Sequence, residues 1–124
     1  MDGDQTQDRE VQLKQRMLRF SIEIIRLVEG IPRSQAGEII GKQLIRCATS
    51  IGANYRSACK GRSKPEFIAK LGIAEEEADE TQYWLEILSS SGLIARGQFE
   101  KLHKEASELT AILTSSGKTA RLNR

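Results

Sequence analysis

Prolines and glycine-bearing breaks divide this chain into four segments, each with apolar residues at helical spacing. The clearest break is GRSKPEF, residues 61–67, where Gly61 suits a helix end and Pro65 falls in the first turn of the next helix. Ser63 and Glu66 have the spacing of a capping box. EGIPRS and SSSGL are the other two breaks, and no segment is convincing as a strand. The sequence therefore predicts an all-α fold.

We expect helices over about residues 9–29, 34–60, 64–90 and 98–115. Helices joined by short links pack antiparallel, so the sequence predicts an antiparallel up-down four-helix bundle over residues 9–116. The first helix carries the apolar residues Val11, Met17, Leu18, Ile24, Ile25 and Val28. The polar residues 1–8 predict a disordered N-terminal segment, and 117–124 predict a flexible basic tail that is solvated or touches nucleic acid.

The bulk composition is consistent with a cytoplasmic protein. No apolar run approaches the ~18 residues of a membrane span, and the acidic, polar amino terminus does not suit a signal peptide. Cys47 and Cys59 are twelve residues apart on one expected helix. Such a separation is about 18 Å, which is beyond disulfide reach, so both are expected to be free thiols in a reducing compartment. The net charge of +2 points to no particular partner.

The expected helix 34–60 has a second strip beside its core face, rich in small residues. Its members are Gly41, Ile45, Ala48, Gly52, Tyr55 and Cys59. A glycine inside a helix costs up to about 1 kcal/mol relative to alanine, so such residues suggest that another helix backbone approaches closely. The strip is therefore a candidate oligomer interface, and tight packing inside one bundle is the alternative.

Asn54 and Trp84 are the other two residues that stand out. Asn54 falls among the apolar residues of the core face, which is typical of a hydrogen-bonded residue that sets helix register; ligand binding is the alternative. Trp84 lies off the expected core face of its helix, either as a lateral core contact or as an anchor between subunits.

Charges are segregated between the second and third helices. From residue 39 to 65 all charges are positive, and the residues form a candidate nucleic-acid-binding set: Lys42, Arg46, Arg56, Lys60, Arg62 and Lys64. From residue 66 to 90 there are seven acidic residues and one basic residue. These neighbouring helices either neutralise one another or leave the basic side chains open to phosphates, and we expect neutralisation more than an open surface.

No arrangement typical of catalysis is visible. Di-iron bundles need two Glu-x-x-His pairs, and His103, beside Glu100, is the only histidine. Cys59 and Ser57 have no nearby histidine or aspartate pattern that could activate them as nucleophiles. No Gly-rich loop that could hold a phosphate is present. We therefore expect no catalytic residue, metal, cofactor or small-molecule substrate, and a protein that is not an enzyme.

The middle of the chain, about residues 43–93, resembles the bacterial four-helix bundle proteins known as ribosomal-RNA intervening-sequence proteins. The matching positions are Arg46, Ala48, Ser50, Ile51, Ala53, Asn54, Arg62, Ser63, Glu66, Phe67, Leu71, Ile73, Ala74 and Glu80. The chain departs from the family at residues 55–58, which read YRSA where many members have Ile-Ala-Glu-Gly. The resemblance implies an up-down bundle that assembles into a ring-shaped homopentamer. It extends to the accessory protein of diversity-generating retroelements, a similar pentamer whose basic surface engages nucleic acid and reverse transcriptase.

Two functions follow as hypotheses. The first is a non-enzymatic homo-oligomer, a pentamer by resemblance, which binds RNA, DNA or a nucleic-acid-processing partner through the basic side chains of the second helix. The alternative is a purely protein-binding oligomeric scaffold without nucleic-acid contact. Neither hypothesis involves a membrane.

Overall fold

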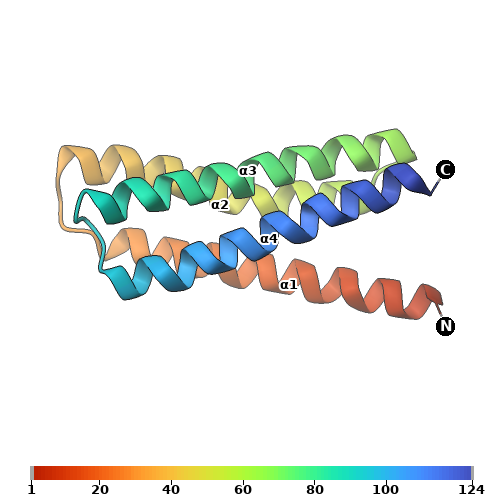
Figure 1. Cartoon of the computed structure of the whole chain (residues 1–124), viewed down its shortest axis with the longest axis horizontal. Helices are drawn as coiled ribbons and strands as arrows, with labels where there is room; N and C mark the ends of the chain where they lie inside the picture. The colour runs from red at the N-terminus through yellow and green to blue at the C-terminus, as the bar shows by residue number, and fades with distance from the viewer. Residues whose placement is uncertain (1, 124) are drawn as a thin grey trace.

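The computed structural model describes residues 2–123, with side chains from residue 5. It contains four long helices in the order α1 (Asp2–Glu29), α2 (Gln35–Cys59), α3 (Lys64–Ser90) and α4 (Arg96–Leu122) (Figure 1). No strand occurs among residues 2–123. The all-α prediction is confirmed.

Each helix packs against its two neighbours around the bundle. α2 and α3 share an extensive contact, as do α3 and α4, whereas α1 packs mainly on α2 and only lightly on α4. Ion pairs also join α1 to α4: Arg16 lies 2.7 Å from Glu105 and 3.7 Å from Glu108, and Lys101 lies 3.4 Å from Glu23. The links α1–α2 and α3–α4 lie at one end of the bundle and the link α2–α3 at the other, which confirms the antiparallel up-down arrangement (Figure 1).

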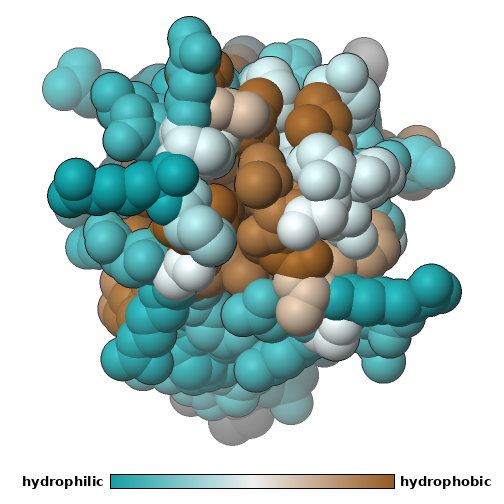
Figure 2. All heavy atoms as spheres, turned by 90° about the vertical axis from the view of Figure 1, so that its left-hand side faces the viewer, coloured by the Kyte–Doolittle hydropathy of each residue, from teal (hydrophilic) through white to brown (hydrophobic). Residues whose placement is uncertain are grey.

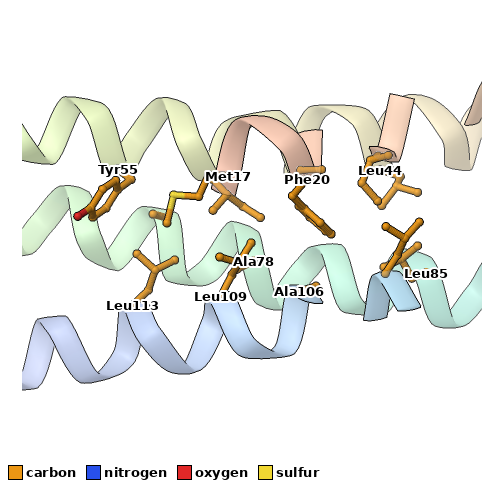
Figure 3. Packing of buried hydrophobic residues seen from close by; sticks show 14 of the residues in the cluster. Met17, Phe20, Leu44, Tyr55, Ala78, Leu85, Ala106, Leu109 and Leu113 are labelled. Atoms are coloured by element: carbon orange, nitrogen blue, oxygen red, sulfur yellow. The ribbon is translucent and has the colours of Figure 1, made fainter. Parts of the chain in front are cut away.

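The core is aliphatic, with one phenylalanine and one tyrosine among its buried side chains. Figure 3 shows side chains from all four helices pointing toward one another: Met17, Phe20, Leu44, Tyr55, Ala78, Leu85, Ala106, Leu109 and Leu113. Alanines on α3 and α4 let these helices approach closely, while the larger side chains fill the space between layers.

Helix ends follow the turn chemistry of the sequence. Ser34 and Ser63 accept hydrogen bonds from the backbone N–H groups of Gly37 and Glu66, so each caps the helix that follows. α3 stops at a Schellman motif, in which Gly92 has a φ of 77° and the Leu93 N–H donates to the Leu88 carbonyl at 2.9 Å. A left-handed residue at this position favours glycine, which explains why the chain turns there.

The first and last helices, α1 and α4, are longer than the ranges expected from the sequence. α1 begins at Asp2 and α4 continues to Leu122, because local hydrogen bonds can propagate a helix past the last core contact. α4 also starts earlier than residue 98, since the Gln98 side chain accepts from the Ala95 N–H at 3.1 Å and caps the first turn. Disorder of residues 1–8 and flexibility of 117–124 stay predictions; residues 1 and 124 lie outside the described part.

The end of the bundle that carries two links is closed by apolar side chains. Figure 2 looks onto this end and shows hydrophobic atoms at its centre with hydrophilic atoms around them. Ile31 from the α1–α2 link and Leu93 and Ile94 from the α3–α4 link pack against the core here. Both links therefore contribute to the fold.

Candidate functional site: an apolar groove and a basic end

The small-residue strip of α2 lies inside the bundle, against α1. A Cβ atom on Gly41 would come within 2.8 Å of the Val28 side chain, and one on Gly52 within 3.3 Å of the Cβ atom of Met17. Ala48 and Tyr55 are buried, and Ile45 is half-buried against the core. The structure thus uses the strip for the close approach of α1 and α2 within one chain, and its assignment to an interface between subunits stays a prediction.

A pair of glycine substitutions tests this close approach. Gly41→Ala should lower the free energy of unfolding by about 1 kcal/mol or more, because the added methyl group overlaps the Val28 side chain. Gly72→Ala in α3 is the matched control, since nothing lies within 4 Å of its added Cβ atom. That change should instead stabilise by about 0.5–1 kcal/mol, through helix propensity. Urea unfolding measures both, and a stabilising Gly41→Ala would contradict close packing.

Beside the buried strip, α1 and α2 form an open apolar groove with a volume of about 590 Å³. Its α1 wall carries Val11, Leu18, Ile22 and Ile25, which are all exposed, Leu18 by 60%. Basic side chains also line the groove: Lys14, Arg56 and Lys60. Gly52 belongs to both features, because its backbone faces Met17 on one side and the groove on the other. Monomeric proteins seldom leave such an apolar face open, so the groove is a candidate contact surface.

Asn54 does not lie in the core, contrary to its assignment as a core polar residue. It is only half-buried, and its amide donates to the Ser50 carbonyl at 2.9 Å and to the Ser50 hydroxyl at 2.8 Å. Both bonds stay within α2, because the side chain turns back onto the preceding turn of its own helix. Among the described side chains, the buried polar ones are those of Ser21 and Thr81. The Ser21 hydroxyl lies 3.0 Å from the Met17 carbonyl of its own helix and 3.3 Å from the Ala48 carbonyl of α2, so it has an acceptor on each helix. A serine amid apolar residues of α1 was the only sequence signal for this contact.

Arg46 is neutralised by α3. Its guanidinium lies 3.1 Å from a carboxylate oxygen of Glu77 and 3.2 Å from one of Glu80. The same group donates to the sulfur of Cys47 at 3.1 Å, and Trp84 donates its indole N–H to Glu80 at 3.2 Å. Arg46 therefore joins the basic and acidic helices.

The other five basic candidates are exposed and have no ion-pair partner in the part of the chain that the structure describes: Lys42, Arg56, Lys60, Arg62 and Lys64. Lys60, Arg62 and Lys64 lie at the α2–α3 link, and Lys64 shares a surface pocket with Arg121 of α4. We call these four residues the basic end. Arg56 stands apart from them on the groove, and Lys60 adjoins both surfaces.

Cys47, Glu77 and Glu80 form the one cluster among the described residues with the spacing of metal ligands. Their ligand atoms all lie within 4.8 Å of one another, although the cation in contact with them is the Arg46 guanidinium. Burial raises the pKa of the Cys47 thiol to about 12, and the negative charge of Glu80 adds to the shift. The thiol is therefore protonated at neutral pH and is a poor metal ligand or nucleophile there.

The raised pKa of Cys47 predicts a loss of stability at alkaline pH. The unfolded thiol ionises near pH 9.0, whereas the folded thiol keeps its proton to about pH 12. The unfolded state thus binds fewer protons between these values, so stability falls as pH rises through this window. Burial raises the pKa of Tyr55 as well, in the same direction.

Urea unfolding of the wild type and Cys47→Ala at half-unit steps from pH 8 to 11 measures this dependence. The free energy of unfolding of the variant should decline less steeply with pH. The two proteins are compared by the slope of this decline, because the alanine also changes packing and so shifts the stability at every pH. Parallel declines would contradict the assignment to Cys47.

Two other side chains singled out in the sequence serve lateral contacts. Trp84 is half-buried against the core, with its ring 5.4 Å from that of Tyr83. His103 is half-buried and lies 3.0 Å from Glu86, while Glu100 pairs with Arg96. The Glu100 and His103 side chains thus have separate partners.

These features define a small antiparallel four-helix bundle whose distinctive surfaces are an apolar groove and a basic end. None of the helices among residues 2–123 combines the length and apolar character needed to cross a membrane. The chain belongs to the 23S rRNA-intervening sequence protein family, whose family model matches residues 9–115. The resemblance to the ribosomal-RNA intervening-sequence proteins is thereby confirmed.

A solved relative has the same fold. It is a Bacteroides thetaiotaomicron protein of unknown function from the S23 ribosomal protein family, with 39% sequence identity and a TM-score of 0.80. The alignment covers 85% of this chain and 97% of that one. A comparison with curated proteins found no match.

Proposed function

We propose that this protein is a non-enzymatic cytoplasmic homo-oligomer, with five copies as the family resemblance implies, that binds RNA or DNA through its basic end. The observation that carries the nucleic-acid part is a set of cations at the α2–α3 link, beside Arg121, that have no ion-pair partner among the described residues: Lys60, Arg62 and Lys64. Lys42 is exposed near the other end of α2, apart from this surface. Arg46 contributes little, because Glu77 and Glu80 already neutralise it.

The positions of the acidic side chains of α3 support nucleic-acid binding at the basic end. Glu77 and Glu80 reach Arg46 in the middle of α2, whereas the described ion pairs of α3 include none to the link residues. A cation without a protein partner can replace counterions on a phosphate backbone, and the released ions favour binding. Several copies in one assembly would repeat the basic end and raise the affinity of weak single contacts.

The groove supports the assembly part of the proposal. It is lined by four exposed aliphatic side chains on α1, together with the small residues Gly52 and Ala53 of α2. Covering this face with another copy would remove apolar surface from water, at about 25 cal/mol for each Å². The assembly therefore relies on the groove and leaves Arg62, Lys64 and Arg121 of the basic end free.

Fluorescence anisotropy of a labelled single-stranded RNA of about 20 nucleotides tests nucleic-acid binding, measured from 50 to 200 mM salt. The wild type should bind at low salt, with an affinity that falls linearly in a log–log plot. Arg62→Glu with Lys64→Glu should weaken binding and make the slope shallower by about 1.4 per chain, since each contact with single strands contributes about 0.7.

The matched control reverses two exposed arginines at the opposite end of the bundle, Arg33→Glu with Arg96→Glu. This variant has the same net charge as the test variant. Its affinity for RNA should fall slightly at every salt concentration, and its salt dependence should keep the wild-type slope. Equal losses in the two variants would contradict a localised basic site. An assembled wild type that does not bind RNA or DNA at 50 mM salt would favour the protein-only scaffold.

A further inference from the structure

The outward face of α3 is the second exposed surface with apolar side chains at helical spacing. Its exposed positions recur at intervals of three and four residues and form what we call the α3 stripe: Ala69, Ile73, Glu76, Asp79, Tyr83 and Glu86. Ile73 is 40% exposed and Tyr83 is 57% exposed. The stripe thus combines two large side chains open to solvent with three carboxylates and no base.

Most carboxylates of the α3 stripe form no ion pair within the described part of the chain. Glu76 and Asp79 have no ion-pair partner in the described part of the chain, and only Glu86 has one, in His103. The acidic residues that neutralise Arg46 are Glu77 and Glu80, which lie toward α2 and outside the stripe. The stripe therefore presents a net negative, partly apolar helix face.

The groove between α1 and α2 complements this face in charge and in size. Its apolar wall is accompanied by Lys14, Arg56 and Lys60, with no acidic side chain among the groove residues. From Val11 to Ile25 the wall is about 21 Å long, and the α3 stripe is about 26 Å long, at 1.5 Å per residue. A helix laid along the groove could therefore place aliphatic and aromatic side chains on the wall and carboxylates beside the cations.

We propose that the groove of one copy receives the α3 stripe of a second copy, an inference that rests on the assembly proposed above and names its two contacting faces. α1 and α3 are diagonal helices without direct contact, so the groove and the stripe face different directions (Figure 1). The contact is therefore heterologous: each copy uses its groove toward one neighbour and its stripe toward the other. Repetition of such a contact closes a ring when the rotation between copies permits it.

Two complementary variants test the pairing of these faces. The groove variant carries Leu18→Asp with Ile22→Asp, and the stripe variant carries Ile73→Asp with Tyr83→Asp. All four positions are exposed, so each variant should keep the helical circular dichroism of the wild type. Alone, each should sediment as a single chain of 13.9 kDa in analytical ultracentrifugation.

Mixed in equal amounts at high concentration, the two variants should form a one-to-one dimer and nothing larger. The groove variant still offers an intact stripe, and the stripe variant still offers an intact groove, so one contact can form between them. If the wild type is oligomeric, a mixture that stays monomeric, or a stripe variant that assembles like the wild type, would overturn the pairing of these two faces but not the assembly itself. A wild type that is itself monomeric would instead overturn the proposed assembly.

Discussion

The double substitution Leu18→Asp with Ile22→Asp should reduce the assembled particle to single chains of 13.9 kDa. These side chains are 60% and 39% exposed in the single chain, so their replacement leaves the core of the bundle intact. In an assembly they would be buried against a neighbour, where an unpaired carboxylate costs several kcal/mol. With two carboxylates in every contact, the expected loss of affinity exceeds a thousandfold.

Light scattering at 50 μM protein measures this change in mass. The matched control is Ile39→Asp, which places the same charge at an aliphatic side chain of α2 that is 53% exposed and lies outside the groove. It should keep the mass of the wild type. If the control dissociates as fully as the groove variant, the groove is not the contact surface.

The second large effect concerns the core. Leu44→Ala should lower the free energy of unfolding by about 3–4 kcal/mol, because Leu44 is fully buried and the deleted atoms leave a cavity. For a chain of this size the melting temperature should fall by roughly 10–15 °C. The comparison is best made in the groove variant, so that dissociation of subunits does not add to unfolding.

Ile39→Ala is the matched control for Leu44→Ala, since it is an aliphatic truncation at an exposed position of the same helix. It should change the free energy of unfolding by less than about 0.5 kcal/mol. Thermal unfolding followed by circular dichroism measures both variants. Similar losses at the two positions would contradict the assignment of Leu44 to the core.

The sequence was sufficient to predict the four helices and the ends that lie at the inner links, because those ends depend on local chemistry. Ser34 and Ser63 cap the helices that follow them, and Gly92 ends α3 in a left-handed conformation. Apolar spacing then indicated which helix faces could meet. The caps and the apolar spacing each depend on residues that are close together in the sequence, so distant parts of the chain were not needed to predict them.

The candidate site depended on contacts that a helical wheel does not contain. The spacing of Gly41, Ala48 and Gly52 indicates that some helix comes close, yet it does not say that this helix is α1 of the same chain. Arg46 and Arg56 look equivalent in the sequence, but in the described part of the chain Arg46 forms ion pairs with α3 and Arg56 forms none. The pairing of charges therefore depends on which helix lies beside each side chain.

The groove had a signal in the sequence of α1. Val11, Leu18 and Ile25 were grouped with Met17 and Ile24 as one apolar set, whereas the structure buries only the latter two. A set too wide for one helix face indicates two faces, one for the core and one for a further contact. Separating them required the position of α2.

Native mass measured by light scattering, at low and high salt and with and without a short RNA, tests the proposed function most directly. A nucleic-acid-binding homo-oligomer predicts a particle near five chains at both salt concentrations, with RNA bound at low salt and released at high salt. A single chain of 13.9 kDa at low salt, without bound RNA, would contradict both the assembly and the nucleic-acid contact.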